Sequence, residues 1–258
     1  MRNRSKKTII ITGAGSGIGR AIAIRLAKDG YSIGLIGRRA GNLKQTEKII
    51  KKITPDVIYK TADVRKKDQV YKAVEYISSH LGKLSGAVAA AGIGGSNKPT
   101  RHDRWDNVIK TNLYGTYYAL SAAVQYMKND NEPKQLISIA SLLARIGVKN
   151  YTAYCASKSG ILGLVRALAI GLADKGIRVN AISPGWVDTK MAKRGMNRLA
   201  RINNLTYENA RKNALNAVPL KRMSSPEEIA NVVSFLFGEG ISGFTGQNFD
   251  ISNGSWME

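Results

Sequence analysis

The stretch Thr12-Gly13-Ala14-Gly15-Ser16-Gly17-Ile18-Gly19 follows an apolar run at residues 8–11 and opens a periodic apolar segment from Ile18 to Ala27. Its glycines lack Cβ atoms where a strand must turn sharply into a helix. Backbone N–H groups and the positive helix N-terminus can therefore approach a pyrophosphate. The spacing G-x-x-x-G-x-G differs from the commoner G-x-G-x-x-G fingerprint, and similar turns serve as plain strand-to-helix loops. Other features of the chain are needed to tell a dinucleotide-binding turn from a plain loop.

Length and composition bound the possible folds. The chain has 258 residues, of which 43% are hydrophobic, and this suits one α/β domain with a sizeable core over residues 1–258. No apolar run reaches about 18 residues, so we expect a cytoplasmic protein with no membrane segment. The single cysteine, Cys155, excludes an internal disulfide, and His80 and His102 lie far apart. No metal site is expected.

The charge is unusual for a soluble enzyme. Lys and Arg number 40 against 18 Asp and Glu, which gives a formal charge of +22. Such an excess can indicate nucleic-acid binding. The basic residues are dispersed along the chain, however, without a recognisable nucleic-acid module or an aromatic-basic repeat. We interpret them as solvated helix faces and expect no nucleic-acid partner.

Apolar runs and helical segments alternate along the whole chain. The expected strands are residues 8–11, 31–37, 57–64, 87–91, 135–140, 178–182 and 247–251. The expected helices are residues 18–27, 41–53, 67–81, 104–112, 112–128 and 154–173, a helical insertion at about 189–215, and a last helix opened by Pro226. This alternation predicts an α/β fold, a single-domain Rossmann-type doubly wound parallel sheet with helices on both faces.

A small set of polar residues is expected where such sheets bind ligands, outside the carboxyl ends of the strands. Tyr154 and Lys158 stand four residues apart, hence on one helix face, and Ser141 follows the preceding strand. A Tyr-x-x-x-Lys pair is weak evidence by itself. Its position at the start of a helix near the predicted cradle makes it a candidate catalytic pair.

Taken together, these features resemble the short-chain dehydrogenase/reductase family over nearly the whole chain. The matching positions are Thr12 to Gly19, Asp63-Val64, Asn112, Ser141, Tyr154, Lys158, and Pro184-Gly185 with Val187 and Thr189. The resemblance implies hydride transfer between a nicotinamide and a carbonyl or alcohol, with Tyr154 as proton donor or acceptor. It further implies that Ser141 holds the carbonyl oxygen, Lys158 binds the nicotinamide ribose and Asn112 helps to hold a water relay.

The resemblance also implies which residues hold the cofactor. These are Gly13, Ser16, Gly17, Ile18, Gly19, Arg38, Arg39, Asp63, Val64, Gly92, Tyr154, Lys158, Pro184, Gly185, Val187 and Thr189. One departure concerns Ala90-Ala91-Gly92, where the family usually has Asn-Ala-Gly. The missing amide predicts a weaker tie between neighbouring strands, while the chemistry is retained. Cys155, beside Tyr154, is expected to be a small helix residue and not a nucleophile.

The end of the second strand favours NADP(H), with NAD(H) still possible. An acidic residue there would hydrogen-bond the ribose 2′-hydroxyl of NAD and repel the 2′-phosphate of NADP. This chain has Gly37 followed by Arg38 and Arg39, and arginine suits a phosphate. The alternative is that both arginines simply face water.

The substrate prediction rests on the insertion at about 189–215, which the family places as a lid over the substrate. Residues 189–205 contain basic residues and no acid, and two further arginines lie in the loop after the fourth strand: Lys190, Lys193, Arg194, Arg198 and Arg201, with Arg101 and Arg104. Such a rim would concentrate anions. The C-terminal part, residues 219–246, looks like the 3-oxoacyl reductase branch of the family. We therefore expect a ketone with an anionic handle, most plausibly a 3-oxoacyl thioester.

The anionic group that carries the substrate and the oligomeric state of the protein are also expectations from the resemblance. Lys175 matches a carrier-docking position of the branch, whereas Glu132 falls where another basic residue is expected. We therefore rank a CoA thioester or a small anionic ketone at least equal to a ketone bound to an acidic carrier protein. The lid could also be basic only because the whole protein is. The branch implies a homotetramer formed through the helices near 112–128 and 154–173 and the C-terminal strand.

Two other functions remain open from the sequence. One is an NAD-linked alcohol, sugar or steroid dehydrogenase working in the oxidative direction. The other is a non-catalytic nucleotide-sensing or nucleic-acid-binding protein on the same fold. The intact set of Asn112, Ser141, Tyr154 and Lys158 favours an enzyme.

Overall fold

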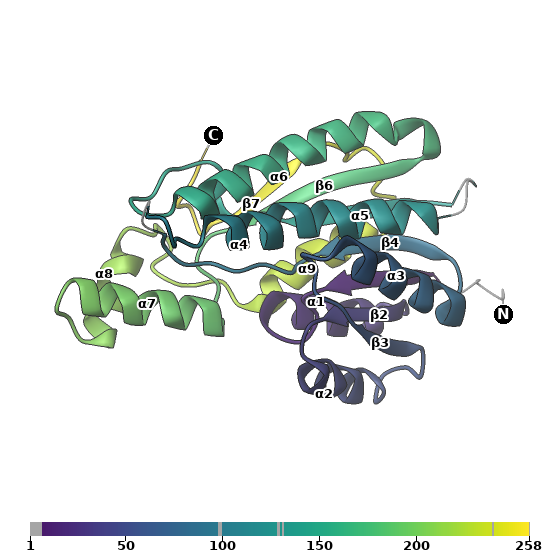
Figure 1. The fold of residues 1–258 in the computed structure, drawn as a ribbon, viewed down its shortest axis with the longest axis horizontal. Coiled ribbons are helices and arrows are strands. Elements are labelled where there is room, and N and C mark those ends of the chain that lie inside the picture. Colours follow the sequence, from purple (N-terminus) through teal and green to yellow (C-terminus); the bar gives the residue numbers. More distant parts are fainter. Residues whose placement is uncertain (1–6, 98–99, 128–129, 131, 239, 258) are drawn as a thin grey trace.

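A computed structural model describes residues 7–97, 100–127, 130, 132–238 and 240–257 (Figure 1). Its strands are β1 (Thr8–Thr12), β2 (Ser32–Gly37), β3 (Val57–Thr61), β4 (Leu84–Ala89), β5 (Lys134–Ile139), β6 (Ile177–Pro184) and β7 (Asn248–Ile251). Within these residues the strands form one sheet in the order β3-β2-β1-β4-β5-β6-β7, and every pairing is parallel. The order reverses between β1 and β4, which opens a crevice at the carboxyl ends of these strands. The α/β Rossmann-type prediction is confirmed.

Helices cover both faces of the sheet (Figure 1). They are α1 (Gly17–Lys28), α2 (Ala40–Ile50), α3 (Lys67–Leu81), α4 (Trp105–Ile109), α5 (Gly115–Gln125), α6 (Thr152–Gly171), α7 (Lys190–Ile202), α8 (Tyr207–Asn216) and α9 (Pro226–Phe237). One buried apolar cluster includes Ile77 of α3, Leu120 of α5 and Val165 of α6. The other includes Ile22 of α1 and Leu236 of α9. The core therefore has two layers, one on each face of the strands.

The predicted insertion at 189–215 is two helices, α7 and α8. They project at one end of the molecule in Figure 1. Thr189 and Thr206 cap them by accepting hydrogen bonds from backbone N–H groups three residues on, as expected for N-cap threonines. Between them, Asn204 has a φ of 52°, in the left-handed region. Asparagine tolerates this conformation better than most residues, which is why the chain can break its helix there.

A π-helical turn, Lys110–Tyr114, joins α4 to α5. The sequence predicts two helices meeting at residue 112 but does not predict this turn. Thr111 and Thr116 donate their hydroxyls to the carbonyls of Asn107 and Asn112 at 2.7 Å. Such bonds to the carbonyl four residues earlier disturb helices, and π turns are frequent at functional sites.

Helix α6 forms the centre of one face. It begins at Thr152, two residues before the predicted start. By length and composition alone it could cross a membrane. In the fold, however, Ile161 and Val165 are buried in the apolar cluster against the sheet, so α6 is a core helix.

Candidate functional site

The predicted site residues gather at the carboxyl edge of the sheet. The glycine-rich turn follows β1, Arg38 and Arg39 follow β2, Asp63 and Val64 follow β3, Gly92 follows β4, Ser141 follows β5, and Pro184 to Thr189 end and follow β6. The strand prediction at 87–91 was wrong at both ends, because β4 begins at Leu84 and stops at Ala89. Ala90 and Ala91 therefore belong to the loop at this edge.

The glycine-rich turn leaves no room for side chains. Gly13 has a φ of 69°, and a Cβ built on it would lie 2.8 Å from the Cα of Ala91. A Cβ on Gly19 would lie 2.5 Å from the carbonyl oxygen of Gly13. Real Cβ atoms do not approach so closely, so glycine is required at both positions. The turn brings bare backbone to the N-terminus of α1, which fits a pyrophosphate.

The missing amide at Ala90 does not leave the neighbouring strands untied. The backbone N–H of Ala91 donates to the Thr12 hydroxyl oxygen at 3.2 Å. Thr12 is the last residue of β1, and it is buried. A side chain of β1 therefore supplies a connection to the loop after β4.

Tyr154 and Ser141 have hydroxyl groups that influence each other. Burial raises the pKa of the Tyr154 hydroxyl, and the nearby Ser141 hydroxyl partly offsets this effect. The Ser141 hydroxyl also accepts from the Leu143 N–H at 3.2 Å, which caps a short 3₁₀ turn at Leu142–Ala144. That turn fixes the serine backbone beside the tyrosine.

Lys158 lies deeper than Tyr154 on the same face of α6. Its ammonium donates to the Ile139 carbonyl at 2.8 Å and stands 5.7 Å from the centre of the Tyr154 ring. Burial lowers its pKa to about 8. A Cβ built on Gly92 would lie 3.6 Å from the Lys158 nitrogen, so the loop after β4 passes directly over the ammonium.

Asn112 is fully buried in the π-helical turn. Its side-chain oxygen accepts from the Ile93 N–H at 2.9 Å, and its amide donates to the Ile93 carbonyl at 3.1 Å and to the Ser157 hydroxyl at 3.0 Å. It thus joins α6 to the loop after β4. Ser157 was missed by the sequence analysis, although it lies one residue before Lys158.

Basic side chains lie at the carboxyl ends of β2 and β3. Arg38 and Arg39 are exposed. Asp63 is paired with Arg65, and the hydrogen bond from this guanidinium, aided by the nearby charge of Arg38, lowers the pKa of the carboxyl group. Arg65 also donates to the Asn107 side chain at 2.9 Å. The sequence analysis missed Arg65, whose only signal was its place two residues after Asp63.

The segment after β6 closes over the glycine-rich turn. The N–H of Gly185 donates to the Ile251 carbonyl at 2.9 Å, and Val187 forms a parallel bridge with Ser224. Thr189 then caps the N-terminus of α7. A Cβ built on Gly17 would lie 3.4 Å from the Thr189 methyl group. The first turn of α7 therefore lies directly against the start of α1.

Helix α7 presents an apolar and a basic side. A Cβ built on Gly94, in the loop after β4, would lie 3.1 Å from the Met191 sulfur and 3.8 Å from the Tyr154 ring. Met191, which the sequence analysis did not single out, therefore lies close to the catalytic candidates. The exposed basic residues of α7 are Lys190, Lys193, Arg194 and Arg201, and Arg198 is half-buried. In the loop opposite, Arg104 donates to the Gly94 carbonyl at 3.2 Å.

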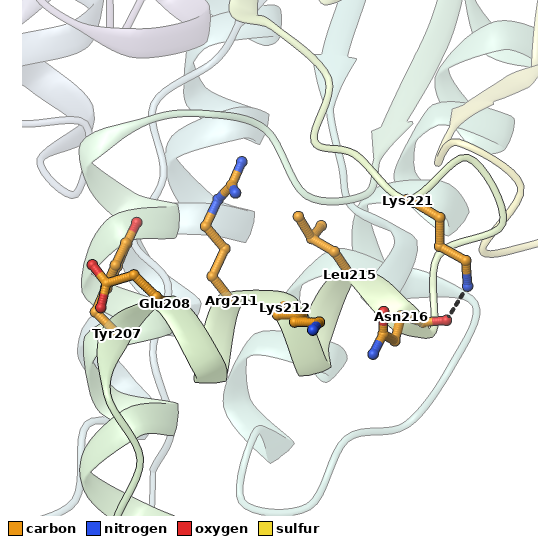
Figure 2. A pocket seen from close by; sticks show the side chains of 7 residues that line it. All are labelled: Tyr207, Glu208, Arg211, Lys212, Leu215, Asn216 and Lys221. Carbon is orange, nitrogen blue, oxygen red and sulfur yellow. Dashed lines mark hydrogen bonds between the residues drawn. The ribbon is translucent and has the colours of Figure 1, made fainter.

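A hollow of about 480 Å³ runs along α8 (Figure 2). It is lined by Tyr207, Glu208, Arg211, Lys212, Leu215, Asn216 and Lys221. It contains none of the predicted catalytic or cofactor residues, so we assign it no part in the chemistry.

Comparisons with known proteins agree with this arrangement. A family model described as enoyl-(acyl carrier protein) reductase matches residues 13–255. The 3-oxoacyl-[acyl-carrier-protein] reductase FabG of Staphylococcus epidermidis is 30% identical over 256 residues, covering 97% of this chain and 99% of that protein. The crystal structure of an actinorhodin polyketide ketoreductase with NADPH is 30% identical, with a TM-score of 0.93 and 99% of each chain covered. Levodione reductase is 30% identical, with a TM-score of 0.88 and 96% of each chain covered. The chain belongs to the short-chain dehydrogenase/reductase family, NAD(P)-dependent oxidoreductases that act on alcohol and carbonyl groups.

Proposed function

We propose that this protein is an NADPH-dependent carbonyl reductase in which Tyr154 donates the proton to the carbonyl oxygen. The observation that carries the proposal is the cluster of Ser141, Tyr154, Lys158 and Asn112 at the carboxyl edge of the sheet. When bound there, NADPH supplies the hydride for the carbonyl carbon. The chain supplies the proton, the orientation and the electrostatic support.

Tyr154 is suited to be the acid. Its raised pKa keeps the phenol protonated at neutral pH, so a proton is available for a carbonyl oxygen within hydrogen-bonding reach. The nearby Lys158 ammonium favours the phenolate left behind. The Ser141 hydroxyl can donate to the same substrate oxygen and stabilise the negative charge that develops on it.

Lys158 and Asn112 complete the cluster. The Lys158 ammonium uses one of its three donors on Ile139, and we assign its other donors to the nicotinamide ribose and to a water. Asn112 fixes the loop after β4, and we assign the π-helical turn around it to the water relay that returns a proton to Tyr154.

The cofactor-binding assignments follow the geometry of the edge. Gly13, Ser16, Gly17, Ile18 and Gly19 would hold the pyrophosphate. Asp63 and Val64 would lie at the adenine. Gly92 would face the ribose, and Pro184, Gly185, Val187 and Thr189 would close over the nicotinamide end.

We propose that NADP(H) is preferred. Arg38 and Arg39 stand exposed directly after β2, and no acid ends that strand. The Asp63 carboxylate, the acid after β3, is neutralised by Arg65. The two exposed guanidinium groups of Arg38 and Arg39 can form charge-assisted hydrogen bonds with a 2′-phosphate bound at the end of β2.

We propose that the substrate is a ketone with an anionic handle, with a 3-oxoacyl thioester as the first candidate. Met191 of α7 lies near Gly94 and Tyr154, and Arg104 donates to the Gly94 carbonyl. In this proposal α7 and α8 form a lid whose exposed basic residues attract the anionic handle. Glu132 pairs with Lys7 at 3.0 Å, so this acid is partly neutralised, and CoA and a carrier protein rank equally as handles.

A cytoplasmic homotetramer is the expected assembly. Aromatic residues are exposed on the surfaces that the family uses for association: Tyr114 and Tyr117 at α5, and Phe235 and Phe244 near β7. Light scattering of the purified protein would test this assembly, because a monomer at micromolar concentration would contradict it.

The substrate proposal is tested by salt dependence. KM for a 3-oxoacyl-CoA and for a neutral ketone is measured with NADPH at low and high ionic strength. If the lid recognises charge, only the thioester's KM rises steeply with salt, and the double variant Arg194→Ala/Arg198→Ala reduces that rise. Equal salt responses of the two ketones would refute an anion-selective lid, and no turnover of any ketone would refute the proposed function.

A further inference from the structure

Asn97 lies in the loop after β4, remote in sequence from the catalytic helix, yet it is almost completely buried against that helix. Its side-chain oxygen accepts from the Ala153 N–H at 3.1 Å and from the Thr152 hydroxyl at 3.2 Å. Its amide donates to the Thr152 hydroxyl oxygen at 2.9 Å and to the Asp103 carboxylate at 3.1 Å. The amide thus uses both its donors and both its acceptor sites.

These contacts replace the missing cap of α6. The N-cap residue of α6, Tyr151, makes no side-chain hydrogen bond to the first turn, and a helix start leaves its first N–H groups without helical partners. Asn97 supplies one such partner from another part of the chain. Its own N–H donates to the Asn150 carbonyl at 2.7 Å, so backbone and side chain both hold the loop to the start of α6.

A second connection joins the same two segments on the other side of Tyr154. Asn112 holds Ile93, at the start of the loop, and Ser157, on α6. Tyr154 therefore lies between two points at which the loop is tied to its helix. Gly94, between the two ties, faces the tyrosine ring.

We propose that Asn97 is a positioning residue that sets the place of the Tyr154 hydroxyl by fixing the first turn of α6 to residues 93–97. The inference rests on the proposed role of Tyr154. It adds Asn97 as a residue that positions Tyr154 from outside the cluster of Asn112, Ser141, Tyr154 and Lys158. Because a misplacement of about 1 Å can cost about 100-fold in rate, loosening this tie would lower kcat and leave cofactor binding intact.

The role of Asn97 can be tested by exchanging the amide of Asn97 and the carboxylate of Asp103. Asn97→Asp removes both donors and sets two carboxylates against each other, because the Asn97 amide nitrogen lies 3.1 Å from an oxygen of Asp103. In Asn97→Asp/Asp103→Asn the new amide at 103 can donate back to the carboxylate at 97. Its oxygen can still accept from the Trp105 N–H, as Asp103 does at 3.0 Å. Asn216→Asp is the matched control, since it makes the same chemical change on an exposed residue at the end of α8.

Three quantities are measured for each variant: kcat with a ketone, the Kd for NADPH, and amide hydrogen exchange of residues 151–157. We expect Asn97→Asp to lower kcat by roughly 10- to 100-fold, to change the Kd by less than about twofold, and to speed the exchange. The double variant should return kcat to within about threefold of the wild type and slow the exchange again. The control should match the wild type.

The opposite results overturn the inference. The positioning role is contradicted if Asn97→Asp leaves kcat unchanged. It is also contradicted if the double variant does not restore a lost kcat, because Asn97 would then have only a structural role. If Asn97→Asp does not fold, Thr152→Val, which removes one partner from an exposed position, must lower kcat with an unchanged Kd or the inference fails. If the wild type reduced no ketone, the proposed function would fail. Hydrogen exchange would still decide whether Asn97 holds α6.

Discussion

Replacing Lys158 by methionine should abolish turnover and at the same time stabilise the cofactor-free protein. A pKa that burial lowers from 10.5 to about 8 corresponds to about 3 kcal/mol against the charged form in the fold. Methionine has a similar length and no charge to bury. Its loss of the hydrogen bond to Ile139 costs about 1–2 kcal/mol. The net gain is about 1–2 kcal/mol, or roughly 2–8 °C in Tm for a chain of this size.

The lowered pKa of Lys158 also predicts how the stability difference between the wild type and the variant changes with pH. Below about pH 8 Lys158 is protonated in both the folded and the unfolded chain, so the full cost of burying the charge is present. Between about pH 8 and 10.5 the folded protein releases the proton and the unfolded chain keeps it. Wild-type stability therefore gains relative to the variant as pH rises through this window.

The assay is thermal unfolding without cofactor at pH 7 and pH 10, with Lys175→Met as the control. Lys175 is exposed, so its replacement should change stability by less than about 0.5 kcal/mol. Lys158→Met should be more stable than the wild type at pH 7, and the difference should shrink at pH 10. A variant that is less stable at pH 7, or a difference that does not depend on pH, would refute the reasoning.

Three further predictions concern the cofactor preference and the helix α9. The wild type should have a higher kcat/KM with NADPH than with NADH, and Arg38→Asp should narrow or invert the ratio; any wild-type preference for NADH would contradict the assignment. Ser225 and Glu228 form a capping box at the start of α9, so Ser225→Ala should cost about 1 kcal/mol in urea unfolding. Hydrogen bonds from Arg222 lower the pKa of Glu228 to about 2, so the carboxylate stabilises the fold above about pH 4.5. Glu228→Gln should be destabilising at pH 7, and its difference from the wild type should shrink as the pH falls toward 2.

The sequence predicts most of the sheet because apolar runs separated by glycine and proline leave few alternatives. The glycine-rich turn and the alternation of strands and helices were sufficient to predict a doubly wound, Rossmann-type parallel sheet. The errors lie at element ends. Ala90 and Ala91 are apolar and read as strand, yet β4 ends before them because Gly13 packs its backbone against Ala91.

Local features that depend on tertiary contacts could not be predicted. The π-helical turn at Asn112 depends on threonine hydroxyls and on Gly115, where a Cβ would lie 2.8 Å from the Val64 side chain. Asn97 reads as an ordinary loop residue, and only the fold shows that it caps a helix 55 residues later. Tyr154 and Lys158 could be predicted because their spacing of four places both on one helix face.

The most direct test of the account is Tyr154→Phe, which removes the transferable proton and keeps the ring that packs in the site. NADPH binding is followed by fluorescence, and ketone reduction by the loss of NADPH absorbance. The account predicts that the Kd for NADPH stays within about threefold of the wild type while kcat falls by roughly 10²- to 10⁴-fold, the usual contribution of a general acid. A variant that keeps more than about a tenth of the wild-type kcat would contradict the assignment of Tyr154 as the proton donor.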